Sequence, residues 1–206
     1  MQLVHYIQML SAMTHSTHIQ NFINYLEAFH QVSGVLQGEM LKKVSHKVLK
    51  EGEVFIKKGG YDKVMGFLSE GIMRIYDVDK EGQEWNKSIL NYQTVLLGNT
   101  ASDRPAIHHI AAISSCHIVT LPVSFVEAVI QQFNELRMIK DSILSRIYQM
   151  KSERESDLLL LTTKERYLKL IDHLGRDVER IPQYHLASFL GVTPIQLSRI
   201  RSSLPA

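Results

Sequence analysis

The sequence has one cysteine, one tryptophan and almost no net charge. The single thiol, Cys116, excludes an internal disulfide and cannot supply the four thiolates that usually hold an iron–sulfur cluster. No run approaches the roughly 18 apolar residues of a membrane span, and the uncharged start lacks the basic segment of a signal peptide. We therefore expect a cytoplasmic protein with no membrane partner.

The length and charge limit what the chain can be. Its 206 residues are enough for one good core and a small second domain. The formal net charge is only +2, so any surface that attracts a polyanion must be local. From Lys164 onward, lysine and arginine outnumber aspartate and glutamate. The C-terminal end is therefore the first place to look for such a surface.

Residues 181–201 have the spacing of a DNA-reading helix-turn-helix. Two short helices that cross at about 90–120° need a small residue at their contact and a glycine at the turn. Ala187 and Gly191 stand at those places. Thr193 is a favourable N-cap and Pro194 a favourable first residue, so the second helix should begin there.

The position of this second helix predicts which side chains contact DNA. Gln196 and Arg199 should point outward to base edges, where glutamine pairs with adenine and arginine with guanine. Arg201 and Arg180 are expected at phosphates, and Thr193 completes the predicted DNA-binding set. The alternative interpretation is an ordinary helical hairpin with a solvated charged face.

Between about Val44 and Leu121, short strand-like segments alternate with glycine-rich turns. Such a series is typical of an all-β barrel or jelly roll. The preceding segment, to about Leu41, looks helical. Residues 1–18 are expected to form a loose extension, and no metal site is predicted because His15 and His18 supply only two ligands.

The segment from about Ser124 to Leu161 is expected to be one long helix, longer than the usual 10–14 residues. Its apolar stripe predicts pairing with a second copy of the chain. Packing along its own barrel is the alternative. The predicted dimer residues are Leu136, Ile139, Ile143, Ile147 and Met150.

In this order of elements, the chain resembles the Crp/Fnr superfamily of bacterial transcription regulators. The resemblance covers nearly the whole chain after about residue 20. It is carried by Gly52-Glu53, by Gly71 with Arg74 and Tyr76, by Asp79-Lys-Glu-Gly82, by the strand from Ala112 to Cys116, and by Lys164-Glu-Arg-Tyr-Leu before the reading motif.

The resemblance implies an α+β fold in which an N-terminal helix and a jelly-roll-like β-roll form a sensor domain, followed by a dimerisation helix and a small all-α domain. The corresponding ranges are 19–123 for the cyclic-nucleotide-binding-like β-roll, 124–161 for the dimerisation helix and 162–206 for the helix-turn-helix domain. Family members usually add a β-hairpin wing after the reading helix. This chain ends at Ala206 without one, so we expect fewer phosphate contacts.

In members that bind cyclic nucleotides, a Gly-Glu pair contacts the ribose, and an arginine followed by a small hydroxyl residue holds the cyclic phosphate. Here Gly98 is followed by Asn99, and Ala106 and Ile107 stand where the Arg-Ser pair would fall; Arg104 comes two residues early. Neither alanine nor isoleucine offers the planar fork that satisfies a phosphate. These five residues mark a candidate effector pocket, but cyclic AMP is not expected, and no cofactor is predicted.

An enzyme is not expected either. A metal-dependent cupin shares a similar β-roll but needs a cluster of histidine and glutamate. His108 and His109 are adjacent on a predicted strand, so their rings should point to opposite faces. No catalytic residue is assigned.

The sequence thus predicts a homodimeric transcription regulator that docks its recognition helices in the major groove of double-stranded DNA at a pseudo-palindromic site. RNA polymerase and an unidentified small molecule are the further partners to consider. The alternative is a ligand-binding or protein-interaction module whose helix-turn-helix is purely structural.

Overall fold

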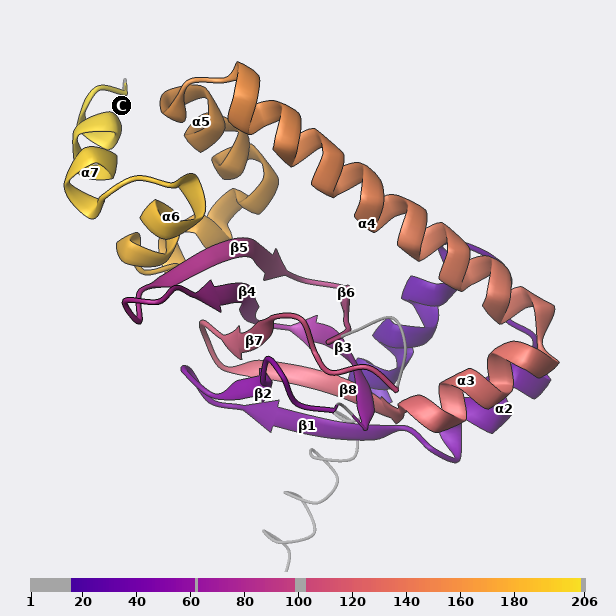
Figure 1. The fold of residues 1–206 in the computed structure, drawn as a ribbon. Coiled ribbons are helices and arrows are strands. Elements are labelled where there is room, and N and C mark those ends of the chain that lie inside the picture. The colour runs from indigo at the N-terminus through magenta and orange to yellow at the C-terminus, as the bar shows by residue number, and fades with distance from the viewer. Residues whose placement is uncertain (1–15, 62, 99–102, 205–206) are drawn as a thin grey trace, which may run out of the picture.

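The computed structural model describes residues 16–61, 63–98 and 103–204. Most of the predicted extension, residues 1–15, lies outside this range, while residues 16–18 already belong to a helix that covers 16–27. A β-roll occupies the middle of the molecule, with helices at one end and a helical domain on top (Figure 1). The predicted α+β fold class is confirmed.

Two four-stranded antiparallel sheets form the β-roll, in the orders β1-β8-β3-β6 and β2-β7-β4-β5. Buried side chains from both sheets fill the space between them, among them Leu68, Met73 and Ile118. The strands are β1 (Ser45–Leu49), β2 (Val54–Ile56), β3 (Val64–Glu70), β4 (Ile72–Val78), β5 (Glu84–Asn91), β6 (Thr94–Leu96), β7 (His109–Ala112) and β8 (Cys116–Pro122).

A glycine makes the tight passage from β3 to β4. Gly71 has φ +104°, a left-handed conformation that glycine adopts without steric cost. A Cβ atom there would stand 2.5 Å from the carbonyl oxygen of Ser115 and 2.7 Å from the sulfur of Cys116. The two sheets can therefore meet at this corner only if position 71 carries no side chain.

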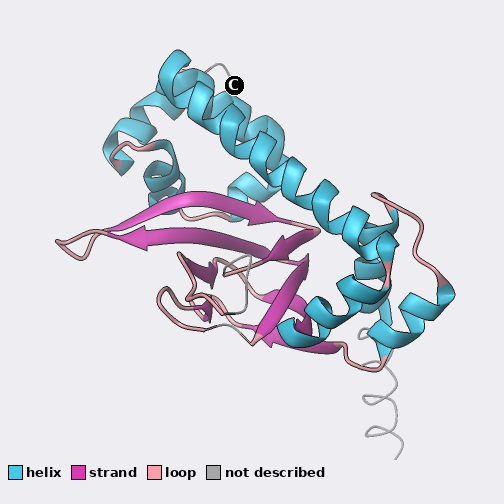
Figure 2. Ribbon diagram, turned by 45° about the vertical axis from the view of Figure 1, so that its right-hand side comes forward, coloured by secondary structure: helices cyan, strands magenta, loops and turns pink. Residues whose placement is uncertain are grey.

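Helices lie at one end of the β-roll, and the longest of them runs from there to the helical domain (Figure 2). They are the helix over 16–27, α2 (Gly34–Leu41), α3 (Val123–Gln132) and α4 (Asn134–Leu160). The predicted helix up to Leu41 is interrupted, because Ser33 caps a new helix by accepting a hydrogen bond from the backbone N–H of Leu36. Both amide and hydroxyl of Ser33 also donate to Glu135, which ties α2 to α4.

The predicted continuous helix over 124–161 is wrong in one respect, since the chain breaks at Phe133. This residue has extended backbone angles, φ −116° and ψ 109°. The break lets α3 and α4 run in different directions while Val129 of α3 and Leu136 of α4 are buried in one core. Periodicity alone cannot reveal such a turn, because the apolar pattern continues across it.

The C-terminal part is all-helical: α5 (Thr163–Leu174), the 3₁₀-helix η1 (Gly175–Arg180), α6 (Gln183–Leu190) and α7 (Pro194–Ser202). Its core also includes Ile72, Ile89 and Ile113 of the β-roll. The helical domain therefore packs directly against the β-roll of its own chain. Among the described residues, no helix is long and apolar enough to cross a membrane.

Candidate nucleic-acid interface and sensor region

Local backbone chemistry sets the geometry of α6 and α7. Gly191 takes a left-handed conformation, φ +73°, and the N–H of Val192 donates to the carbonyl of Ala187 at 3.0 Å, which ends α6. Thr193 then caps α7, with Pro194 at the first turn. Ala187 is 1% exposed at the helix contact. The predicted turn, small contact residue and N-cap are thus all present.

The outer face of α7 differs in part from the predicted set. Leu197 is fully buried and fixes which side of the helix packs inward. Arg199 is exposed as expected, and Ile195 shares its face because it lies four residues earlier on the helix. Ser198 is also exposed and lies three residues after Ile195. Ile195 is 67% exposed, which is unusual for a large apolar side chain. Ile195 is not among the predicted DNA-binding residues, although an outward isoleucine suits the methyl group of thymine.

Gln196 is exposed but already engaged. Its Oε1 accepts from the backbone N–H of Thr193 at 2.9 Å and lies 3.2 Å from the hydroxyl of Thr193, in a capping box. Pairing with both polar atoms of adenine requires a free oxygen as well as the amide nitrogen. In this arrangement Gln196 has only its N–H groups to offer, unless the cap opens.

The two predicted phosphate contacts have different surroundings. Arg201 is exposed near the end of α7. Arg180 donates to Asp177 at 2.8 Å within η1, so a phosphate there would compete with a carboxylate. Arg201 is therefore the better placed of the two for an anion.

Helix α6 is fastened to β5 by polar contacts. The backbone N–H of Asn86 donates to Ser188 Oγ at 2.9 Å, and Ser188 Oγ donates to the carbonyl of Glu84 at 3.1 Å. Asn86 Nδ2 donates to the carbonyl of His185 at 3.0 Å and to its Nδ1 at 3.2 Å. Arg74 donates to Asn86 Oδ1 at 3.2 Å, which orients this amide.

Burial in this interface favours the neutral form of His185, because it lowers the pKa of the ring. Its ring accepts a hydrogen bond at Nδ1 from Asn86, so a proton at Nδ1 would face another N–H group. Burial lowers the pKa of His185 from 6.5 to about 4, the positive charge of Arg74 acts in the same direction, and Glu84 opposes them. Arg74 itself pairs with Glu84 at 2.6 Å. The interface between the domains therefore contains an uncharged, buried histidine.

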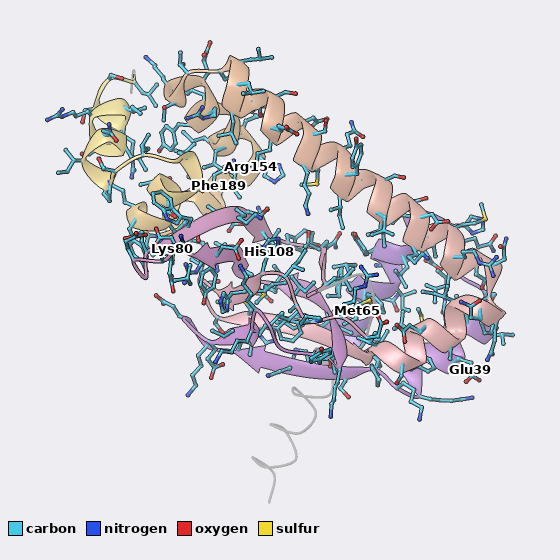
Figure 3. The ribbon with its side chains drawn as sticks, in the orientation of Figure 1. Glu39, Met65, Lys80, His108, Arg154 and Phe189 are labelled. Atoms are coloured by element: carbon cyan, nitrogen blue, oxygen red, sulfur yellow. The ribbon has the colours of Figure 1, made fainter. Side chains whose placement is uncertain are left out.

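Two arginines hold the other end of α6. Arg154 of α4 donates to the carbonyl of Phe189 at 2.7 Å and lies 3.8 Å from the centre of its ring (Figure 3). Arg166 of α5 donates to the carbonyl of Leu190 at 3.2 Å. Both satisfy carbonyls that a helix C-terminus leaves without partners. The orientation of the helix-turn-helix is thus fixed by α4, α5 and β5 together, and none of these contacts uses the outer face of α7.

The predicted effector pocket is only partly described. Ala106 is buried and its backbone pairs with Gly59 and Gly60, while Ile107 is 53% exposed and donates its N–H to the carbonyl of Gly98 at 3.1 Å. Arg104 is exposed on the same loop. Asn99 lies outside the described residues.

Among the described residues of this loop, no side chain offers a buried cation to a phosphate. His108 instead bonds to Asp77 at 2.9 Å, and His109 stacks on Tyr76 with ring centres 4.8 Å apart, so the adjacent histidines diverge.

The predicted dimer residues divide into two groups. Leu136, Ile139 and Ile143 are buried in the core that α4 shares with the N-terminal helix, and Ile147 packs at its edge. Met150 is 46% exposed. Beyond it α4 carries further exposed apolar residues that are not in the predicted set: Leu158, Leu159 and Leu160, with exposures of 47%, 79% and 80%.

No family model matches the sequence, and no curated protein matches it either. Solved structures do share the fold. FixK2 from Bradyrhizobium japonicum aligns with a TM-score of 0.69 over 78% of this chain and 84% of its own, at 13% identity. A putative transcriptional regulator of the Crp/Fnr family from Eubacterium rectale gives 0.67 over 86% and 85%, at 12% identity.

A cyclic nucleotide-binding domain containing protein from Listeria monocytogenes gives a TM-score of 0.65 over 91% of this chain and 90% of its own, at 18% identity. These TM-scores show a shared fold, whereas identities this low leave the activity open. Each of the three alignments covers more than three quarters of this chain. The chain has the fold of the Crp/Fnr transcription regulators.

Proposed function

We propose that this protein is a sequence-specific DNA-binding transcription regulator that acts as a homodimer. The observation that carries the proposal is the free outer face of α7, where Ile195, Ser198 and Arg199 lie exposed on a capped helix. An α-helix fits the major groove, and an arginine with an apolar neighbour can read guanine and thymine there. The fold it shares with transcription regulators supports the same conclusion.

The domain contacts are compatible with this role. Ser188 and His185 of α6 face β5, and Asp177 of η1 accepts a hydrogen bond from Asn91 at 3.3 Å. These contacts hold the domain by the side opposite its reading surface. Ile195, Ser198 and Arg199 are exposed while these contacts are made.

Dimerisation rests on the exposed end of α4. Leu159 and Leu160 are about four-fifths exposed, and Tyr148 is 75% exposed on the same helix. Large apolar residues gathered on one helix are favourable for a partner helix. The occupant we propose is a second copy of α4, which would place two recognition helices about one helical turn of DNA apart.

Cyclic AMP is not proposed as the effector. Its phosphate needs a cation in the pocket, and Ala106 and Ile107 supply none. We expect no heat of binding when cyclic AMP is titrated into the protein. A saturable signal there would contradict this part of the proposal.

DNA binding is tested by fluorescence anisotropy with a labelled mixed-sequence duplex at increasing salt. Binding should weaken steeply with salt, because each phosphate contact releases counterions. Arg201→Ala should reduce the slope of log affinity against log salt by about 1. Arg137→Ala removes the same charge from an exposed position on α4 and serves as the matched control.

No saturable binding at low salt would contradict the proposal and favour the interaction module with a structural helix-turn-helix. Equal losses for Arg201→Ala and Arg137→Ala would also contradict it, since the interface would then not involve the end of α7.

A further inference from the structure

Three histidines meet where the N-terminal helix crosses the first sheet. His18 belongs to the helix over 16–27, His46 to β1 and His117 to β8. In the antiparallel pairing of β1 with β8, His46 lies opposite Val119, two residues from His117. The two strand histidines are therefore diagonal neighbours on one face of the sheet. That face is the one that the N-terminal helix covers.

The nitrogens of this cluster are close together. Nε2 of His46 lies 3.0 Å from Nδ1 of His117. One ring nitrogen from each of His18, His46 and His117 can be chosen so that all three lie within 4.8 Å of one another. The rings stack with centres 4.3–5.1 Å apart. Histidines from three separate segments thus converge on one small volume.

The spacing suits a metal ion. Nitrogen ligands about 2.0–2.1 Å from a tetrahedral Zn²⁺ are about 3.3–3.4 Å from one another. The widest separation here exceeds this by about 1.5 Å, which rotation of the imidazole rings can supply. Imidazole prefers Zn²⁺, Cu²⁺ and Ni²⁺ over Mg²⁺ and Ca²⁺, which take oxygen ligands.

The hydroxyl of Ser69 orients His18, the buried histidine of the cluster. His18 is 3% exposed, and its Nδ1 lies 2.9 Å from Ser69 Oγ. Asn21 also donates to this oxygen, at 3.1 Å. When Nδ1–H of His18 donates to Ser69, the ligand lone pair is on Nε2. Ser69 is therefore a positioning residue that selects the tautomer.

We propose that His18, His46 and His117 form a binding site for a divalent transition-metal ion of the Zn²⁺ class. Three nitrogen ligands leave a fourth position for water or a small anion. The ion would fasten the N-terminal helix to the sheet. This helix shares its core with Leu136, Ile139 and Ile143 of α4. The proposal does not depend on DNA binding.

The test begins with the tag-free full chain, incubated with Zn²⁺, passed through gel filtration and analysed for metal. We expect about one Zn²⁺ per chain. Co²⁺ in place of Zn²⁺ should give the visible absorption of a tetrahedral or five-coordinate site. Less than about a fifth of an equivalent of Zn²⁺ would overturn the proposal, whatever the variants do.

Variants then assign the ligands. His46→Gln and His117→Gln should each weaken Zn²⁺ binding at least about 100-fold in isothermal titration calorimetry, and Ser69→Ala about 10–100-fold. His30→Gln is the matched control, because His30 is not part of the histidine cluster and its Nδ1 lies 3.0 Å from the backbone carbonyl of Gln31. Circular dichroism without metal checks that each variant is folded.

Two results would contradict the assignment. Unchanged affinity in both strand variants would place the metal elsewhere. An equal loss in His30→Gln would mean that Zn²⁺ binds exposed histidines without a defined site. Intact wild-type stoichiometry with selective loss in the strand variants is the result that the geometry predicts.

Discussion

Acidification should loosen the contact between the helical domain and the β-roll through His185. The ring is neutral in the folded protein, with a pKa of about 4, whereas an unfolded histidine has a pKa of about 6.5. Between these values the unfolded chain binds more protons, so stability falls as the pH decreases. The contribution is complete above about pH 6.5 and is lost progressively towards pH 4.

The size of this pH-dependent change in stability follows from the difference between the folded and unfolded pKa values of His185. Each unit of pKa corresponds to about 1.4 kcal/mol, so the whole shift sets an upper value of about 3 kcal/mol. We expect about 2 kcal/mol, because solvent at the edge of the interface screens part of the charge. This is a substantial fraction of a typical domain stability.

The assay uses the single tryptophan. Trp85 lies on β5 between Glu84 and Asn86, and its indole N–H donates to Asp79 at 2.7 Å, so its fluorescence should report unfolding of the β4–β5 hairpin on which α6 packs. Urea unfolding followed at Trp85 gives the free energy at each pH. The pH dependence should be weaker in His185→Gln than in the wild type, which isolates this residue from the other histidines.

A second variant should change the pKa of His185 in the opposite direction. Asn86→Asp replaces the donor at Nδ1 with an acceptor, so it should raise the pKa of His185 and shift the loss of stability to higher pH. The imidazole resonances of His185 in an NMR titration measure this directly. An ordinary pKa for His185 in the wild type, or identical pH profiles in wild type and His185→Gln, would refute the reasoning.

Two further predictions concern stability and assembly. Gly71→Ala should destabilise the protein by more than about 2 kcal/mol in urea unfolding, since its Cβ would overlap the carbonyl of Ser115, whereas Gly38→Ala in α2 meets no atom and should be neutral or stabilising by up to about 1 kcal/mol. Similar effects of both substitutions would contradict this account of the corner. Leu160→Glu should convert the dimer to a monomer in light scattering, and Val35→Glu, equally apolar-to-acidic at an exposed site on α2, should leave it unchanged. A dimer that survives Leu160→Glu would place the interface elsewhere.

Local chemistry explains what could be predicted from the sequence. A threonine followed by a proline favours the start of a helix, and Gly191 takes the left-handed turn that separates α6 from α7. Glycine punctuation likewise predicted most strands. Such features depend only on residues that are neighbours in the sequence, so they can be predicted from the sequence alone.

Features that depend on distant residues could not be predicted in this way. The break at Phe133 depends on how α3 and α4 share a core, and the docking of α6 depends on Asn86 of β5. The histidine cluster needs the register of β1 against β8. His18 was assigned to a loose extension and excluded as a metal ligand, because its companions lie 28 and 99 residues further along the chain.

The capping role of Gln196 shows another limit of prediction from the sequence, because one side chain can fit two patterns. Its outward position on α7 was predictable, but a glutamine three residues after a threonine N-cap also completes a capping box. The same side chain thus satisfies two patterns, and the structure has it in the second. Ile195 and Arg199, whose side chains have no such engagement in the described structure, are the better candidates for reading bases.

Selection of bound duplexes from a random library tests the central proposal most directly, with the wild type and Arg199→Ala analysed in parallel and Arg137→Ala as the control. We predict enrichment of a pseudo-palindromic motif, with half-sites about one helical turn apart, by the wild type and the control. Arg199→Ala should lose specific affinity far more than non-specific affinity. No enriched motif at low salt, or the same motif with Arg199→Ala, would contradict the assignment of α7 as the base-reading element.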